Sequence, residues 1–179
     1  MLNFHKAELA DASMIATLVN SAYRGESSRA GWTTEADILD GARVSTADIA
    51  AIIKDSLNAS SPKFIIIGEK NDAIIGTICC EKNEKYAHLG MIAVKPSAQN
   101  KGFGKALIQA AETIALREWR VTGFEMDVIS IRSELIAFYE RLGYERTGAF
   151  KEFPVNTELW QPKVKDLKLA RLLKLVNTQ

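Results

Sequence analysis

The fold of this chain is decided by one stretch of its sequence, Val94-Lys95-Pro96-Ser97-Ala98-Gln99-Asn100-Lys101-Gly102-Phe103-Gly104-Lys105-Ala106-Leu107. A strand is expected to end at the valine, the proline turns the chain, and a long helix begins after two closely spaced glycines. Because glycine has no Cβ, a ligand can approach the backbone here and several N–H groups can point at one anion. The positive end of the helix dipole and the flanking lysines favour an anion at the same point. The stretch therefore predicts a cradle for a phosphate or pyrophosphate group.

Three kinds of phosphate-binding loop share this physics, and the spacing of residues separates them. A P-loop requires glycine where this chain has Gln99, and serine or threonine where it has Ala106. A Rossmann fingerprint requires a third small residue where this chain has Leu107. The remaining pattern, Gln-x-x-Gly-x-Gly after a Val-x-Pro strand end, closely resembles the acyl-CoA pyrophosphate loop of the GNAT superfamily of N-acyltransferases. The alternative is a glycine-rich turn that only starts a helix.

A second stretch, Leu135 to Tyr144, resembles the same family because it ends in Tyr-x-x-x-Gly-aromatic. In that family the tyrosine hydroxyl lies near the sulfur of coenzyme A and can protonate the departing thiolate. Matched position by position, this role falls to Tyr139, which shares a helical face with Leu142 and could instead be a core tyrosine. Many members have asparagine seven residues before that tyrosine, where this chain has Arg132, a residue that could reach the cofactor.

The resemblance covers residues 2 to about 150 and implies the fold. The expected class is α/β (α+β), a mixed and mostly antiparallel central sheet of six to seven strands flanked by about four helices. Residues 1–179 are expected to form a single domain, with 24–46 on the acceptor side. The segment 162–179 is expected to be a strand or a helix, because its leucines fit both periods.

Hydrophobic periodicity predicts the elements along the chain. A continuous apolar run at 64–67 indicates a strand covered on both faces, and short polar turns join it to strands at 73–81 and 88–94 in an antiparallel meander. Two amphipathic helices are expected, each with an N-cap residue and one buried apolar face. The first is capped by Asp11 and buries Met14, Ile15, Leu18, Val19 and Ala22. The second is capped by Ser45 or Thr46 and buries Ile49, Ile52, Ile53 and Leu57. The other expected elements are strands at 3–8, 124–129 and from 144, helices at 104–122 and 133–142, and a turn or two of helix at 34–39.

The composition excludes several classes of protein. The chain has 179 residues, of which 47% are hydrophobic and 25% charged, so it is neither mostly disordered nor fibrous. Its 23 basic and 22 acidic residues leave a net charge of +1, whereas a nucleic-acid binder requires a basic surplus. No apolar run approaches the ~20 residues of a membrane span. We therefore expect no nucleic-acid and no membrane partner, and a monomer or homodimer.

The two cysteines, Cys79 and Cys80, are adjacent and have no third cysteine to pair with. This excludes a secreted disulfide scaffold, and no nearby CxxC or histidine cluster completes a metal site, so no metal is expected. The two side chains are expected on opposite faces of a strand. Residues 1–10 contain no long apolar run, so no signal peptide is expected and the chain is interpreted as cytoplasmic.

The family's reaction assigns tasks to particular residues. The acceptor amine attacks a thioester, so its ammonium form, with a pKa of about 10, must first lose a proton. The thioester carbonyl becomes an oxyanion and requires a backbone N–H donor. In GNAT folds the strand before the cradle splays from its neighbour and leaves its backbone free for the pantetheine arm; Gly90 in this strand fits a bulge or a close approach. The resemblance implies that the cofactor contacts Ile92, Ala93, Val94, Gln99, Asn100, Lys101, Gly102, Phe103, Gly104, Lys105 and Arg132.

The general base is predicted to be His88, near the start of the same strand. In several relatives a glutamate near this point takes the amine proton, and a histidine with an unperturbed pKa near ~6.5 suits the task. The alternatives are a strand-edge histidine with no task, Glu81 or Glu84 as the base, and a route through water alone.

The acceptor is expected to contact the irregular segment 26–46, which in the family forms one wall of the acceptor pocket. The expected substrate-binding residues are Trp32, Glu26 and Glu35. Together with Asp37 and Asp40 they suit a cationic amine, although exposed loops are polar by default and Arg29 and Arg43 dilute the negative sign. Residues 150–154 are expected to close the other wall.

The sequence therefore predicts an N-acetyltransferase that moves an acetyl group from acetyl-CoA to a primary amine, by direct attack and with a small-molecule acceptor. One alternative keeps the fold and changes the acceptor to a protein N-terminus or lysine, which an open groove would favour. Another is a non-catalytic module that binds acyl-CoA as a sensor.

Overall fold

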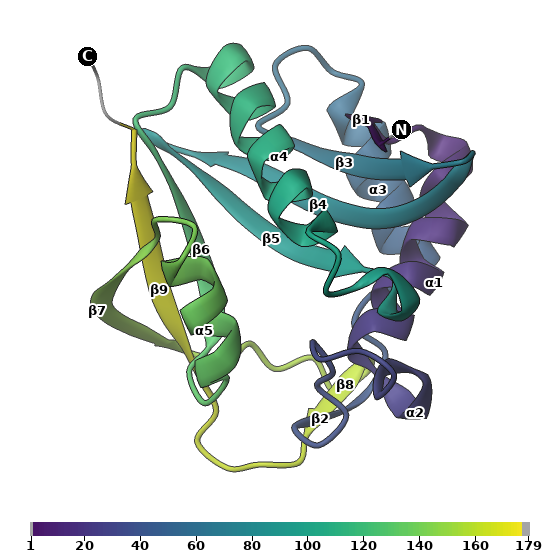
Figure 1. The fold of residues 1–179 in the computed structure, drawn as a ribbon, viewed down its shortest axis with the longest axis vertical. Coiled ribbons are helices and arrows are strands. Elements are labelled where there is room, and N and C mark those ends of the chain that lie inside the picture. The colour runs from purple at the N-terminus through teal and green to yellow at the C-terminus, as the bar shows by residue number, and fades with distance from the viewer. Residues whose placement is uncertain (1, 177–179) are drawn as a thin grey trace.

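The computed structural model of this chain describes residues 2–176 (Figure 1). The strands are β1 (Leu2–Lys6), β2 (Leu39–Gly41), β3 (Lys63–Lys70), β4 (Ala73–Asn83), β5 (Tyr86–Val94), β6 (Gly123–Ile129), β7 (Glu145–Glu152), β8 (Trp160–Pro162) and β9 (Lys168–Leu175). The helices are α1 (Ala12–Tyr23), α2 (Gly25–Ser28), α3 (Thr46–Ser56), α4 (Phe103–Trp119) and α5 (Ser133–Glu140), with 3-10 turns η1 (Leu9–Asp11) and η2 (Pro96–Ala98). The predicted meander of three strands is β3, β4 and β5, and it is confirmed.

Seven strands form one mixed sheet in the order β1-β3-β4-β5-β6-β9-β7, and β2 pairs with β8 in a separate ribbon. All neighbouring pairs of the large sheet are antiparallel except β5 and β6, so the predicted class is confirmed. Helices α4 and α5 cover one face, and α1 and α3 cover the other (Figure 1). Cys80 packs into the first of these two cores and Cys79 into the second, as the adjacent cysteines of a strand must.

The parallel strands β5 and β6 part soon after they begin. Their pairing covers only Tyr86–His88 of β5, after which the two strands diverge (Figure 1). The pairing of β4 with β5 shifts register between Thr77 and Cys79, and Met91 opposite this shift has a φ of +50°. Such a positive φ is rare outside glycine and is typical of a bulge at a functional site. The bulge thus follows Gly90 by one residue and lies past the point where β5 leaves β6.

The expectations about α1 are confirmed in part. Asp11 is the N-cap residue of α1, as predicted, but its side chain makes no capping hydrogen bond to the helix; its carboxylate accepts the backbone N–H of Glu8 at 2.8 Å. Met14 is 53% exposed, whereas the other four residues of the expected stripe are buried. The buried stripe is centred on Ile15 and Val19, which are fully enclosed, and this rotation turns Met14 toward solvent.

In α3 the predicted cap is confirmed, because the Ser45 hydroxyl accepts the N–H of Asp48 in a reciprocal capping box. Leu57, however, is 78% exposed, because the helix ends at Ser56 and releases it from the buried stripe. Residues 34–39 form turns that lead into β2 and not a helix; the short helix of this region is α2, several residues earlier.

The ambiguous C-terminal segment is strand. β9 lies between β6 and β7, and its Ala170 and Leu172 are buried in the α4 face of the sheet. The alternating period therefore decides this segment, because a strand inserted between two others buries every second side chain. The last residues of the predicted segment, 177–179, lie outside the described residues.

Candidate functional site

Two cavities of about 340 Å³ each lie where β5 leaves β6. The first, here called the cradle cavity, is bounded by the loop before α4 and by α5. The second, here called the arginine cavity, is bounded by β5, β6, segment 24–44 and segment 151–160. Both are lined by the same four residues, which form the wall between them: Tyr23, Ile92, Leu135 and Tyr139.

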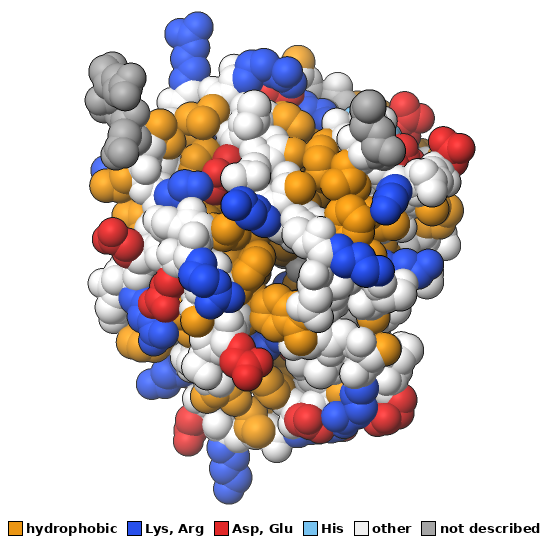
Figure 2. Space-filling view, in the orientation of Figure 1, with side chains coloured by type: hydrophobic (Ala, Val, Ile, Leu, Met, Phe, Trp, Pro, Cys, Tyr) orange, Lys and Arg blue, Asp and Glu red, His pale blue; other side chains and the backbone are white. Residues whose placement is uncertain are grey.

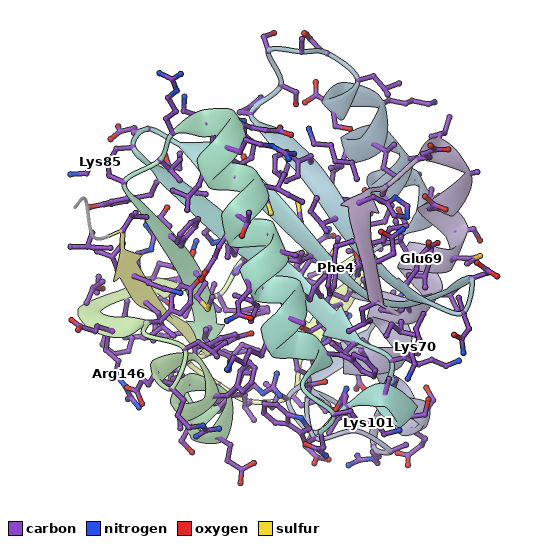
Figure 3. The ribbon with its side chains drawn as sticks, turned by 45° about the horizontal axis from the view of Figure 1, so that its top comes forward. Phe4, Glu69, Lys70, Lys85, Lys101 and Arg146 are labelled. Atoms are coloured by element: carbon purple, nitrogen blue, oxygen red, sulfur yellow. The ribbon has the colours of Figure 1, made fainter. Side chains whose placement is uncertain are left out.

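The cradle cavity contains much of the predicted phosphate loop. Gly102 is the residue before the first turn of α4, with a φ of +79° and open space where a Cβ would stand. The first turn of α4 contains no acidic residue that would oppose an anion. Figure 2 shows a hollow between α4 and α5 with Lys and Arg side chains around it, and Figure 3 shows Lys101 beside the start of α4. The predicted loop residues that line the cavity are Gln99, Asn100, Gly102, Gly104 and Lys105.

Other predicted cofactor residues lie elsewhere. Ala93 is buried under α1, on the opposite face of the sheet. The Lys101 ammonium donates to the Ser97 carbonyl at 3.0 Å, and Phe103 packs beneath Lys70 in a small apolar cluster. None of these three side chains lines the cradle cavity, so only their backbone remains a candidate contact.

Gln99 links the cradle to the acceptor-side segment. Its amide donates to the Val94 carbonyl and to the Thr33 hydroxyl, both at 2.9 Å, and its carbonyl accepts the Trp32 N–H at 2.9 Å. Gly31 must lack a side chain for this link, because a Cβ there would stand 2.6 Å from the Gln99 amide oxygen. A residue predicted to bind a cofactor thus also holds segment 24–46 against the end of β5.

The shared wall carries Tyr139. It projects from α5, contacts the rings of Phe138 and Tyr144 edge-on, and is 95% buried. Burial raises the pKa of its hydroxyl well above the usual range, so the group stays protonated at neutral pH. No hydrogen bond within residues 2–176 engages this hydroxyl, which leaves it able to donate a proton to a group bound at the wall.

The backbone of β5 is the other part of the wall. Ile92 and Val94, both predicted cofactor contacts, line the cradle cavity. The Tyr23 hydroxyl donates to the Ile92 carbonyl and so fixes the strand just after the bulge at Met91. Because β6 has already diverged, no strand of the described part of the chain pairs with the β5 backbone past His88 on that side. A ligand in either cavity can therefore bond to it as an edge strand would.

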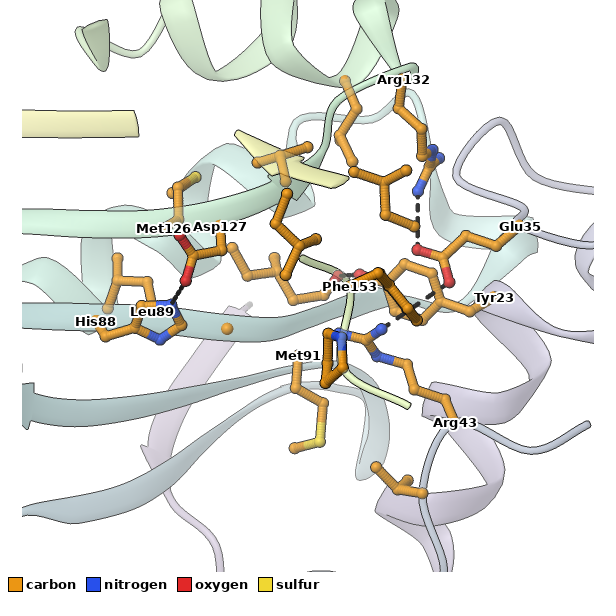
Figure 4. Close-up of a pocket in the computed structure, with 18 of the residues that line it drawn as sticks. Tyr23, Glu35, Arg43, His88, Leu89, Met91, Met126, Asp127, Arg132 and Phe153 are labelled. Atoms are coloured by element: carbon orange, nitrogen blue, oxygen red, sulfur yellow. Dashed lines mark hydrogen bonds and ion pairs between the residues drawn. The ribbon is translucent and has the colours of Figure 1, made fainter. Parts of the chain in front are cut away.

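His88 lies at one end of the arginine cavity, bonded to Asp127 on β6 at 3.3 Å (Figure 4). Arg171 and Lys151 also bond to the Asp127 carboxylate. Burial alone would raise the pKa of Asp127, but these hydrogen bonds outweigh it and hold that pKa far below its usual range. A charged carboxylate can only accept a hydrogen bond. The tautomer of His88 that fits this contact therefore has its hydrogen on Nε2 and its lone pair on Nδ1. A side chain at Gly90 would press on the ring edge that carries Nδ1.

An arginine cluster lies at the other end of the arginine cavity (Figure 4). Glu35, predicted to bind the acceptor, is 96% buried and forms an ion pair with Arg24. Arg132 Nη1 lies 3.3 Å from one Glu35 oxygen, and Arg43 Nη1 lies 3.9 Å from the other. Arg132 therefore lines the arginine cavity and not the cradle cavity, because the buried carboxylate holds it there.

The other predicted acceptor residues are divided between different places. Trp32 lines the cradle cavity and contacts Phe138 edge-on, so the structure brings it to the phosphate side. Glu26 lines neither cavity, because its exposed carboxylate pairs with Arg29. Asp37 pairs with the same arginine. The expected second wall does reach the arginine cavity through Lys151, Phe153 and Pro154.

Sequence reasoning missed Tyr23, Asp127 and the grouping of Arg24 with Arg43. Tyr23 reads as the apolar end of α1, and only its bond to the Ile92 carbonyl distinguishes it. Asp127 carried one signal: it is, with Glu125, one of two carboxylates inside the buried strand β6, and buried carboxylates have to be paired. The arginines gave no signal, since segment 24–46 contains both signs of charge.

Two negative results apply to residues 2–176. No helix there is long and apolar enough to cross a membrane. No group of three or more histidine, cysteine or acidic side chains is placed to hold a metal ion in that range.

Comparison with known proteins agrees with this geometry. The sequence model described as the Acetyltransferase (GNAT) family matches residues 26–144. Among solved structures, yncA, a putative acetyltransferase from Salmonella typhimurium with its cofactor acetyl-CoA, has a TM-score of 0.71 at 16% identity, covering 100% of this chain and 96% of that chain. The ribosomal-protein-S18-alanine N-acetyltransferase from Escherichia coli has a TM-score of 0.67 at 16% identity, covering 100% and 96%. The spermidine/spermine N-acetyltransferase SpeG from Vibrio cholerae has 0.68 at 18% identity, covering 97% and 92%.

Proposed function

The chain belongs to the GNAT acetyltransferase family, and from that premise we propose that it transfers an acetyl group from acetyl-CoA to the primary amine of a small molecule. The observation that carries this proposal is the meeting of two cavities at one wall, formed by Ile92 of the splayed strand and Tyr139 of α5. One cavity holds a phosphate cradle and the other holds a histidine. A thioester at the wall would therefore be open to an amine on the arginine-cavity side.

The residues of the cradle cavity fit the phosphates of coenzyme A. The positive φ of Gly102 and the open space beside it let a phosphate reach the backbone N–H groups at the start of α4. Lys105 and Arg141 add two positive charges to the lining and Glu134 adds one negative charge, so the lining is positive on balance. Acetyl-CoA supplies the thioester, and the chain supplies its orientation.

His88 is proposed to accept the proton that the acceptor ammonium must lose. The Asp127 carboxylate fixes the ring so that Nδ1 is the basic atom, which takes the proton directly or through water. Tyr139 is proposed to donate its hydroxyl proton to the thiolate that leaves, and to regain a proton from the acceptor nitrogen, which loses its second proton as the amide forms. The N–C bond then forms as the C–S bond breaks, and no acyl group is carried on the chain. Burial raises the pKa of Cys79 to about 11, so this thiol is a poor nucleophile.

The β2–β8 ribbon beside the arginine cavity supports a small acceptor over a protein. The ribbon joins segment 39–41 to segment 160–162, and residues next to or within both segments, Arg43 and Trp160, line the cavity. Lys163 strengthens the junction by donating to the Ala36 carbonyl at 2.7 Å and by pairing with Asp40. A peptide would require an open groove at this place.

The test is release of free coenzyme A from acetyl-CoA over a panel of amines, with acetyl-CoA binding measured by calorimetry. His88→Gln is expected to lower kcat about 100-fold. The matched control is His5→Gln, since His5 also bonds to a carboxylate, Glu69, but lines neither cavity. Binding without release for any amine would identify an acyl-CoA sensor, and equal activity of both variants would remove His88 as the base.

A further inference from the structure

The arginine cluster carries more positive charge than its carboxylate can balance. Arg24, Arg43 and Arg132 all approach Glu35, so three guanidinium groups share one carboxylate and two positive charges remain in excess. Arg24 and Glu35 are almost completely buried. Unbalanced charge away from water is costly, and it is retained where a bound ion of opposite sign offsets it. The cluster therefore points to an anion in the arginine cavity.

Two nitrogen atoms of the cluster support the same conclusion. Arg24 Nε and Arg43 Nε are buried, and neither has a hydrogen-bond partner among residues 2–176. Buried N–H groups are nearly always paired in native proteins, and charged ones especially so. The Arg24 side chain is 95% buried, whereas that of Arg43 is 28% exposed, so Arg43 keeps an enclosed Nε and a guanidinium that a ligand in the cavity can reach.

The position of Arg43 relates this anion to the reacting amine. The Arg43 guanidinium lies 4.6 Å from the ring centre of Tyr23, and Tyr23 belongs to the wall shared with the cradle cavity. An anionic group bound by Arg43 would thus lie close to the place where the acetyl group arrives. In an α-amino acid the carboxylate and the amine are separated by a single carbon, which satisfies both requirements.

We propose that the acceptor is an α-amino acid, whose carboxylate binds the arginine cluster through Arg43 and whose amine faces the wall. This inference rests on the proposed function and narrows its acceptor. It also replaces the cationic acceptor expected from the carboxylates of segment 26–46, because the structure directs Glu26 and Asp37 to Arg29 and surrounds Glu35 with arginines.

The remaining surface of the cavity indicates the side chain of that amino acid. Apart from its charged residues the lining is mostly apolar and includes Met91, Met126, Val128, Phe153 and Leu169. At the far end, Asp127 is balanced by Arg171 and Lys151, so residues 2–176 present no free carboxylate there to attract a second ammonium. Figure 4 shows the two charged ends on opposite sides of the cavity. An apolar side chain fits this lining, and the amine held beside the cluster would then lose its proton to His88 through water.

The experiment compares leucine, methionine and phenylalanine with their amides and with the amines that lack the carboxylate. For the wild-type protein, kcat/KM for at least one amino acid should exceed that of its amide about tenfold or more, the discrimination expected of a charge-assisted hydrogen bond. Arg43→Gln should bring that ratio toward one. Arg29→Gln is the control, because Arg29 belongs to the same segment, pairs with Asp37 and lines neither cavity; it should keep the wild-type ratio.

Binding of the same compounds is measured by saturation-transfer NMR in the presence of coenzyme A, so the proposal is tested even without turnover. Preferential binding of an amino acid without acetyl transfer would support the anion site and refute the proposed function. Amides or simple amines that bind and react as well as the amino acids would overturn the inference and leave the proposed function intact. A ratio unchanged by Arg43→Gln would also overturn it.

Discussion

Replacing Gly102 by glutamate tests the cradle at its most exposed point. Gly102 has a φ of +79°, and nothing lies within 4 Å of the position that a Cβ would occupy. The new side chain therefore meets no steric obstacle, and the folded chain bears only the cost of a left-handed residue, about 1–2 kcal/mol. The carboxylate would stand at the start of α4, where the proposed pyrophosphate binds.

The loss of affinity follows from Coulomb's law. Two like unit charges 4 Å apart repel by about 1 kcal/mol in water and by about 4 kcal/mol near a protein surface. A pyrophosphate carries at least two charges, so the solvent-like limit is about 2 kcal/mol, or about 30-fold in the dissociation constant of acetyl-CoA. Lower screening within the cavity would increase this factor, and added salt would reduce it.

Gly148 provides a matched control for this prediction. Its φ is also +79°, its Cβ position is also open, and it lies on β7 away from both cavities. Gly148→Glu should lose the same free energy of unfolding as Gly102→Glu but keep wild-type affinity, both measured by urea unfolding and calorimetry. Equal acetyl-CoA affinity of the two variants would refute a phosphate cradle at α4.

Two further predictions concern the wall and the histidine end of the arginine cavity. Tyr139→Phe should lower kcat about 10- to 100-fold with little change in the acetyl-CoA dissociation constant. The control, Tyr144→Phe, should keep kcat and lose about 1–3 kcal/mol of stability, because the Tyr144 hydroxyl bonds to buried Glu112. If Tyr139→Phe keeps the wild-type kcat, Tyr139 has only a core role. Asp127→Asn should cost about 2 kcal/mol of unfolding free energy at pH 7. The pKa of Asp127 is lower in the folded than in the unfolded state, so its stabilising effect is present above the unfolded pKa of about 4 and is lost as the pH falls below that value. A difference in unfolding free energy between variant and wild type that stays constant down to pH 2 would contradict a charged, paired Asp127.

Features that depend on neighbouring residues were predictable. The two glycines and the Val-x-Pro strand end predicted the loop before α4, because few sequences can turn from a strand into a helix while leaving N–H groups open. The apolar run at 64–67 predicted a strand covered on both faces, and all four side chains are buried. The Ser45 cap was predictable for the same reason, since its partner is only three residues away.

Features that depend on rotation or exact length of a helix were less predictable. Met14 and Leu57 match the helical period, yet one turns to solvent and the other follows the last turn of α3. The alternative readings of the C-terminal segment were equally periodic. Only insertion of β9 between β6 and β7 selects the strand, because neighbouring strands supply the hydrogen bonds that an isolated segment lacks.

The glycine-containing turn before α4, the meander and the family could be read from the sequence, because these follow from backbone conformation and from side-chain period over short distances. The tertiary structure alone decided the sign of the charge in the arginine cavity. Arg24, Arg43 and Arg132 come from separate segments and meet at Glu35 only in the folded chain. Electrostatic energy depends on distances in space and on burial, and a near-zero net charge contains neither.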